Sequence, residues 1–396
     1  MTMTDMMNKN SKAPSKLGLY IHIPFCRSKC LYCDFCSFVG RSGDERERYI
    51  DALCREIAAR GTKEYTVDTV YFGGGTPSLL SAGQVGRILS AVRESFALDG
   101  DVEITLECNP MIGRNVEGAV PYGVLEYFAD LKKIDVNRLS IGIQSAIDTE
   151  LKLIGRRHSF EDARCTFFAA RDAGFDNISV DLMLGIPSQT ADSLACSVRA
   201  LCELSPEHVS IYSLQLEEGT PLYRMREKYD LADDDTAAEM YELVVGAMRE
   251  AGYCHYEISN FARVGRESRH NSKYWALDEY LGLGIAAHSD FLGKRSENTQ
   301  DMDAYLSGRW LLCEQEISVR EREFEFLMLG LRTQQGISKS EFYVRFGVNF
   351  DEKYGSAVEK FDKIGYFARN DDRVALNERG FEVSNSILEQ ILDFDY

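Results

Sequence analysis

The stretch LGLYIHIPFCRSKCLYCDFC, residues 17–36, joins a strand pattern to four closely spaced cysteines. Its first four aliphatic residues alternate with Gly18, Tyr20 and His22, which predicts a β-strand. Pro24 ends this strand, because proline supplies no ladder N–H. A thiol-rich loop is therefore expected directly after the first strand. The cysteines are separated by three, two and two residues: Cys26, Cys30, Cys33 and Cys36.

Four interpretations of these thiols compete. Free buried cysteines without a role seldom cluster, and disulfides need an oxidising compartment, to which nothing else in the chain points. A structural Cys₄ zinc site is the serious alternative, although such sites usually pair two short cysteine units across an intervening segment. An iron–sulfur cluster is favoured, because Cys26, Cys30 and Cys33 would leave one iron of a [4Fe–4S] cubane open to an outside ligand.

The composition limits the class of protein. The chain has 396 residues, enough for about two or three domains, and its 44% hydrophobic content is ordinary for a protein with a buried core. A net charge of −18 argues against a nucleic-acid partner. The odd number of cysteines, 11, and the lack of a secretory pattern in residues 1–16 favour reduced thiols in the cytoplasm. No apolar run approaches the roughly 20 residues of a membrane span.

Strand patterns alternate with helix patterns between residues 17 and 216. This alternation predicts an α/β fold, a partial (β/α)6 barrel of parallel strands similar to a TIM barrel. Residues 217–317 are expected to extend the barrel. Residues 318–396 are expected to form a winged-helix-like α+β domain that covers the barrel mouth as a lid, and residues 1–16 a disordered tail. The predicted strands are 17–23, 67–72, 101–108, 137–144, 177–187 and 208–216.

Glycines and polar residues lie at or directly after the carboxyl ends of nearly all the predicted strands, and Asp181 lies within the fifth. Because these ends meet at one rim of a (β/α) barrel, where active sites are built, a single site is expected there together with the cysteine loop. Each residue also has a structural explanation, such as a tight turn, a helix cap or a solvated side chain. Asp181 is more informative, since a buried carboxylate needs donors. The residues are Gly74, Gly75, Thr76, Glu107, Gln144, Arg156 and Asp181.

The cysteine spacing resembles the signature of the radical SAM superfamily, a CX₃CX₂C loop directly after the first barrel strand. The resemblance implies that Cys26, Cys30 and Cys33 bind a [4Fe–4S] cluster, and that S-adenosylmethionine (SAM) binds its fourth iron. The aromatic Tyr32 before the third cysteine also matches the signature. Cys36 is then not a ligand.

Within this superfamily, residues 17–390 resemble the oxygen-independent coproporphyrinogen III dehydrogenase-like branch. The motifs YIHIPFC, GGGTP, ECNP, IGIQS, GRRH and VDLM carry the resemblance. It implies that each motif contributes at least one residue to the SAM-binding site. These residues are Tyr20, Gly74, Gly75, Thr76, Glu107, Gln144, Arg156 and Asp181. Some relatives bind a second SAM molecule there.

The branch contains a dehydrogenase, which oxidatively decarboxylates porphyrinogen propionates through a 5′-deoxyadenosyl radical, and HemW-type heme chaperones. The dehydrogenase has a longer N-terminal arm, a C-x-C where this chain has Cys33 and Cys36, and no HNxxYW stretch. This chain carries that stretch at residues 270–275. The resemblance therefore favours the heme chaperone, with the dehydrogenase as the alternative, and no residue is assigned a catalytic role.

A chaperone of this type needs a ligand for heme iron. His270 of the HNxxYW stretch is the expected ligand, because a neutral imidazole is a common axial ligand of heme. Alternatively, His270 and Asn271 only cap a turn, and His288 is a second candidate. The expected partners are heme, a heme-acceptor protein that could lie in a membrane, and an electron donor if the cluster is reduced.

Overall fold

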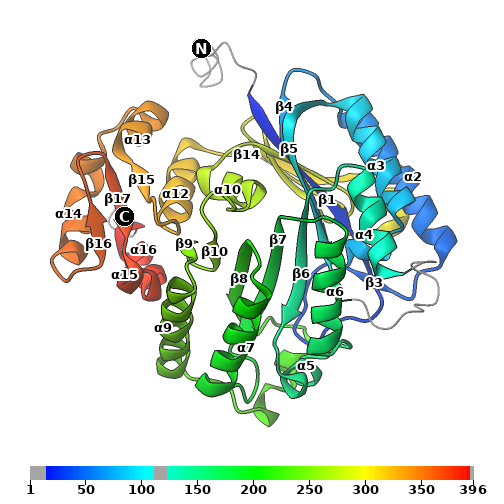
Figure 1. Ribbon diagram of the computed structural model, residues 1–396. Helices are drawn as coiled ribbons and strands as arrows, with labels where there is room; N and C mark the ends of the chain where they lie inside the picture. The colour runs from blue at the N-terminus through cyan, green and yellow to red at the C-terminus, as the bar shows by residue number, and fades with distance from the viewer. Residues whose placement is uncertain (1–14, 111–122, 393–396) are drawn as a thin grey trace.

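Six parallel strands form the centre of the molecule (Figure 1). The computed structural model describes residues 15–110 and 123–392, so nearly all of the predicted tail lies outside the described residues. Each neighbouring pair of the six strands is parallel, which confirms the predicted α/β fold. The strands are β1 (Lys16–Ile23), β4 (Thr66–Gly74), β5 (Ala97–Cys108), β6 (Arg138–Gln144), β7 (Ile178–Leu184) and β8 (His208–Ser213).

Helices between these strands cover the outer face of the sheet (Figure 1). Aliphatic residues at helical spacing make the contact, as Val85, Ile88 and Leu89 of α3 do. Helix α2 starts at the N-cap Ser42, whose hydroxyl accepts from the N–H of Glu45. No helix of the described residues is long and apolar enough to cross a membrane. The helices are α2 (Gly43–Arg60), η1 (Pro77–Leu79), α3 (Ala82–Ser95), α4 (Val124–Lys133), α5 (Asp148–Leu153), α6 (Phe160–Asp172) and α7 (Ala191–Leu204).

The sheet continues beyond both edges of the six strands. Strand β11 lies parallel beside β1 and is followed by three antiparallel strands, while a hairpin of β10 and β9 lies beside β8. The strand order is β14-β13-β12-β11-β1-β4-β5-β6-β7-β8-β10-β9. The elements of this segment are α8 (Pro221–Arg224), η2 (Arg226–Lys228), α9 (Asp234–Glu250), β9 (Cys254–Glu257), β10 (Asn260–Ala262), α10 (Arg269–Ala276), β11 (Tyr280–Leu283), β12 (His288–Phe291), β13 (Lys294–Asn298), α11 (Met302–Leu306) and β14 (Leu311–Glu316).

Helix α10 closes the amino-terminal end of the barrel. Ser268 caps its first turn, and the carboxylate of Glu103 on β5 accepts the backbone N–H of His270 at 3.2 Å. One turn further on, Lys273 forms a 2.8 Å ion pair with Asp68, near the start of β4, and both side chains are buried. These contacts involve Asp68, near the start of β4, and Glu103, whose sheet partner on β4 is the next residue, Thr69. The helix therefore lies at the end of the barrel opposite the carboxyl rim.

Residues 318–392 build a second hydrophobic core of their own. Five helices pack around a three-stranded antiparallel sheet, which includes the predicted hairpin near 366–376. This arrangement agrees with the winged-helix-like domain expected from the sequence. The elements are α12 (Val319–Gly330), β15 (Ile337–Ser338), α13 (Lys339–Phe346), α14 (Phe350–Asp362), β16 (Phe367–Arg369), β17 (Arg373–Leu376), α15 (Glu378–Glu382) and α16 (Ser384–Leu392).

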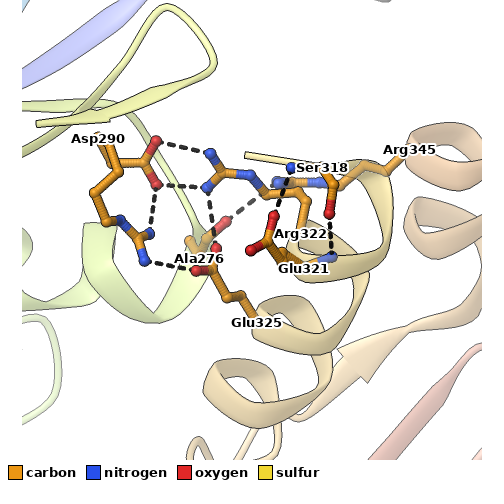
Figure 2. A network of polar contacts seen from close by, with 8 residues as sticks. Ala276, Asp290, Ser318, Glu321, Arg322, Glu325 and Arg345 are labelled. Atoms are coloured by element: carbon orange, nitrogen blue, oxygen red, sulfur yellow. Dashed lines mark hydrogen bonds and ion pairs between the residues drawn. The ribbon is translucent and has the colours of Figure 1, made fainter. Parts of the chain in front are cut away.

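This C-terminal domain packs against the side of the barrel, next to α9 and α10 (Figure 1). At one edge of the sheet, Arg322 of α12 and Arg295 of β13 both bind the buried carboxylate of Asp290 (Figure 2). Near the other edge, the N–H of Ile258 donates to the carbonyl of Arg332 at 3.1 Å. The domain's charges and backbone groups are therefore paired with the sheet edges. Its role as a lid over the barrel mouth stays a prediction.

Candidate functional site

The cysteine loop lies at the carboxyl end of β1, as predicted. It runs between two short paired strands, β2 (Phe25–Cys26) and β3 (Phe38–Val39). The backbone of Leu31 anchors the loop, since its N–H donates to the carbonyl of Ile154 at 3.0 Å and its carbonyl accepts from Leu222 at 2.9 Å. All four thiols of the loop are free and partly exposed.

A chain of hydrogen bonds joins two of these cysteines across the rim. The Thr76 hydroxyl donates to Sγ of Cys26 at 3.6 Å and accepts from the side-chain amide of Asn109 at 3.0 Å. The amide oxygen of Asn109 accepts from Arg156 at 2.7 Å, and Nη1 of Arg156 lies 3.6 Å from Sγ of Cys30. Three different strand–helix connections supply Thr76, Asn109 and Arg156. The rim thus brings together residues that the sequence places far apart.

The groups beside the thiols suit a bound iron–sulfur cluster. A coordinated thiol is deprotonated, and hydrogen-bond donors such as those of Thr76 and Arg156 stabilise its sulfur. Burial raises the pKa of the Cys33 thiol, so a bound metal rather than the protein would hold this group as a thiolate. Among residues 15–110 and 123–392, no three His, Cys, Asp or Glu side chains are grouped to hold one metal ion. The thiolates of a cubane each bind a separate iron.

Packing alone explains the glycine run at the end of β4. Gly74 has a φ of +105°, and a Cβ there would lie 2.4 Å from the ring of His22. A Cβ on Gly75 would lie 2.8 Å from the carbonyl oxygens of Ile23 and Phe25. The turn could not approach β1 and β2 so closely with larger residues. A role of Gly74 and Gly75 in SAM binding stays a prediction.

Two carboxylates lie on the inner face of the barrel below the loop. Glu107 accepts from the Tyr71 hydroxyl at 2.9 Å and from the N–H of Gly74 at 3.2 Å. Asp181 accepts from the Ser140 hydroxyl at 3.2 Å. Burial raises the pKa of Glu107 to about 7 and the pKa of Asp181 to about 6. A ligand with cationic or hydrogen-bond-donating groups would stabilise the charged form of both.

The remaining predicted rim residues lie near these groups. Tyr20 stacks on Tyr71 with 6.3 Å between ring centroids, and its hydroxyl lies 3.2 Å from Nδ1 of His22. Tyr32 packs against a small apolar cluster beside the cysteine loop. Gln144 ends β6 with a φ of +71°, a strained conformation for a residue other than glycine. Such strain concentrates at functional sites.

His270 does not lie at the rim. Its Nδ1 is 2.8 Å from the hydroxyl of Thr69, which precedes the end of β4 by five residues, or about 16 Å along a strand. Its Nε2 is 2.9 Å from the hydroxyl of Tyr274. The side chain is 1% exposed, and burial lowers its pKa to about 3. Neither ring nitrogen is free to bind iron in this arrangement, so a role of His270 as heme ligand stays a prediction.

Sequence reasoning misses two residues of the rim. Asn109 connects Thr76 to Arg156, and Tyr71 orients Glu107. The position of Asn109, directly after the third predicted strand, is the signal that could have identified it. Tyr71 gives no such signal, because an aromatic residue within a strand is most often part of an apolar core.

The comparisons with known proteins agree with this geometry. Residues 20–201 match the radical SAM superfamily, and residues 317–383 match the HemN C-terminal domain. The heme chaperone HemW of Bacillus subtilis is 34% identical, over 94% of this chain and 98% of its own length. The heme chaperones HemW of Lactococcus lactis and Escherichia coli are each 33% identical, over 94% and 95% of this chain and 96% and 98% of theirs.

A solved structure resembles the whole chain. Coproporphyrinogen III oxidase (HemN) from Escherichia coli, described as a radical SAM enzyme, aligns with a TM-score of 0.81, over 98% of this chain and 92% of that chain. Its sequence is 21% identical, so this likeness shows the fold alone. The assignment to a family within the superfamily rests on the full-length relatives that are more than 30% identical. The chain belongs to the radical SAM superfamily and, within it, to the family of HemW heme chaperones.

Proposed function

We propose that the protein is a heme chaperone that binds SAM on a [4Fe–4S] cluster, binds heme and transfers the heme to an acceptor protein. The observation that carries the proposal is the likeness to HemW heme chaperones over nearly the whole chain, at 33% to 34% identity. The hydrogen-bonded rim from Cys26 to Cys30 supports the cofactor part, because its donors face the thiols that the superfamily uses.

Cys26, Cys30 and Cys33 would hold the cluster, which when bound and reduced supplies one-electron chemistry to SAM. Thr76 and Arg156 donate hydrogen bonds to cysteine sulfur. Asn109 holds both of these donors, so their positions are fixed before any ligand binds.

The inner face below the loop would hold SAM. Both oxygens of Glu107 already accept hydrogen bonds, which fixes the orientation of this carboxylate toward an amino or hydroxyl group of SAM. Asp181 is held by Ser140 in the same way. We assign the remaining contacts to residues around these carboxylates. They are Tyr20, Tyr32, Gly74, Gly75, Thr76, Gln144 and Arg156.

In this proposal the protein carries heme as its cargo and has two kinds of partner, a heme acceptor and an electron donor. The acceptor is a heme protein in its heme-free form, within a membrane or outside it. A low-potential electron donor would reduce the cluster if the physiological cycle requires its reduced state. The names of the HemW relatives support heme as cargo.

The proposal is tested with the full chain after anaerobic reconstitution of the cluster. Titration with hemin should produce a saturable Soret band, and the loaded protein should pass heme to an apo-hemoprotein in a mixing experiment. The same preparation, given SAM and a reductant, should leave coproporphyrinogen III unchanged. Conversion of coproporphyrinogen III to protoporphyrinogen IX without hemin binding would contradict the chaperone function and establish the dehydrogenase.

A further inference from the structure

The six histidines of the chain all lie within the described residues and differ in how their rings are used. Five are buried, and the ring of each makes a hydrogen bond. A ring of this kind must give up a hydrogen bond before it can bind a metal at the bonded nitrogen. The partners are Tyr20 and the Cys36 carbonyl for His22, the Ile143 carbonyl for His158, Ser179 and Tyr256 for His208, Tyr241 and the Ile258 carbonyl for His255, and Thr69 and Tyr274 for His270.

His288 is the exception. It is exposed, and among residues 15–110 and 123–392 its ring makes no hydrogen bond. It starts β12, two residues before Asp290, whose partner across the sheet is Tyr280 of β11. Side chains two residues apart on a strand share a face, so His288 lies on the same face as Tyr280. The ring of Tyr280 contacts Tyr274 of α10 at 4.7 Å, which identifies this face as the inner face of the barrel.

The position of His288 along the barrel is near the carboxyl rim. Strand β12 is antiparallel to β11, so His288 lies closer to the rim than Asp290 does. A Cβ on Gly282 would meet the backbone of His288, and Gly282 is the β-sheet partner of Tyr20. His288 is also close enough to His22 to contribute to the lowered pKa of that ring, behind the larger effect of burial.

The surroundings of this position include exposed apolar groups, which a porphyrin face requires. Nε2 of His22 lies 2.9 Å from the carbonyl of Cys36, so the end of the cysteine loop is next to His22. Phe35 and Val39 of that segment are 63% and 50% exposed. On the opposite side of the barrel, Tyr212 near the end of β8 is 42% exposed.

We propose that His288 is the axial ligand of heme iron, and that heme binds at the rim next to the cysteine loop. This inference rests on the proposed function, because a heme chaperone needs a ligand for the heme iron. A neutral imidazole donates a nitrogen lone pair to heme iron. His288 can do so without breaking a hydrogen bond, whereas the buried ring of His270 would have to give up its hydrogen bond with Thr69 or Tyr274. His270 is then a residue that holds α10 in place.

The test is hemin titration of the full, anaerobically reconstituted chain, followed by absorbance. His288→Ala should shift the Soret band and weaken binding by more than the roughly 10- to 100-fold loss that follows when an outer-shell partner of a metal is removed. Added imidazole should restore the wild-type band in H288A, which a merely structural role would not predict. The His270→Ala variant should show the wild-type Soret band but a lower melting temperature. If H270A does not fold, His270→Gln is used in its place. Iron–sulfur absorbance should be the same in all variants.

An unchanged band and affinity in H288A would overturn the inference while leaving heme binding intact. Loss of the band in a folded H270Q variant, with H288A unaffected, would overturn it in favour of His270. If the wild-type protein itself binds no hemin, the proposed function fails together with the inference.

Discussion

The two ends of the barrel hold their polar groups in different ways. At the carboxyl rim, the cysteine thiols are free, and burial raises the pKa values of Glu107 and Asp181. At the amino-terminal end, His270 and Lys273 of α10 are paired with groups on β4. Buried polar groups that pair with one another usually serve folding, whereas perturbed ionisable groups at an open rim are candidates for binding. The comparison therefore favours the rim, with its free thiols, over the amino-terminal end as the place where we expect a ligand to bind.

The largest expected effect comes from a substitution at the carboxyl rim, which should leave the amino-terminal end of the barrel intact. Cys26→Ala should abolish the iron–sulfur absorbance of the reconstituted protein and nearly all of its bound iron and sulfide, because a cluster ligand is lost. Far-UV circular dichroism should not change, since the thiol is partly exposed and the barrel core does not involve it.

Cys36→Ala is the matched control, because Cys36 is in the same loop and is not assigned to the cluster. It should retain the cluster at the wild-type level. Equal loss of iron in C36A would contradict the assignment of three ligands, and zinc in place of iron after anaerobic purification would restore the zinc interpretation.

The next largest effect is expected from a substitution in the buried ion pair at the amino-terminal end of the barrel. Lys273→Met leaves the carboxylate of Asp68 buried and paired only with the more distant Lys16, at 3.8 Å. Loss of one partner of a buried ion pair costs about 3–5 kcal/mol, which urea denaturation would measure as a lower free energy of unfolding. Lys294→Met removes an exposed pair with Glu314 and should change stability little. Equal effects in the two variants would show that α10 is not held by a buried pair.

A smaller loss is expected where the C-terminal domain meets the barrel (Figure 2). Arg322→Ala leaves Asp290 with Arg295 alone, at 3.2 Å, and should lower the free energy of unfolding by about 2 kcal/mol, the usual value of a hydrogen bond to a charged group. Limited proteolysis near residue 318 should become faster. Unchanged proteolysis and stability would mean that this ion-pair network does not hold the domain on the sheet edge.

The last effect concerns pH. An ordinary glutamate has a pKa of about 4.3, whereas Glu107 in the folded protein has a pKa of about 7. Between these values the folded state binds more protons than the unfolded state, so the free energy of unfolding falls as pH rises. The Glu107→Gln variant has no carboxyl group to titrate at this position. Its free energy of unfolding should therefore fall less over that pH range than that of the wild-type apoprotein. Parallel stability curves for the two proteins would remove Glu107 from the set of perturbed groups.

The six barrel strands and most of the rim could be predicted from the sequence for a physical reason. Parallel strands buried on both faces are short apolar runs, and the polar residues that end them must meet at one rim. Glu107 lies one residue before the end of β5, whereas Asp181 lies in the middle of β7. Asn109 directly follows the third predicted strand and fits the same pattern, but its partners could not be predicted, because Thr76 and Arg156 are 33 and 47 residues away in the chain.

The HNxxYW stretch shows the limit of motif reasoning. Its spacing predicts that His270 and Tyr274, four residues apart on a helix, contact each other, and they do at 2.9 Å. It cannot predict that the other nitrogen of His270 is bound by Thr69, 201 residues away, inside the barrel. The ion pair between Asp290 and Arg322 of the C-terminal domain could not be predicted for the same reason, since it joins segments that no local pattern connects.

Hydrogen–deuterium exchange with and without hemin tests the central claim most directly, because it reports on both ends of the barrel at once. If heme binds at the rim, backbone amides in residues 25–39 and 284–291 should exchange more slowly in the hemin complex, and those in 269–276 should be unchanged. Protection of residues 269–276, with the rim segments unchanged, would contradict the account and place heme at α10.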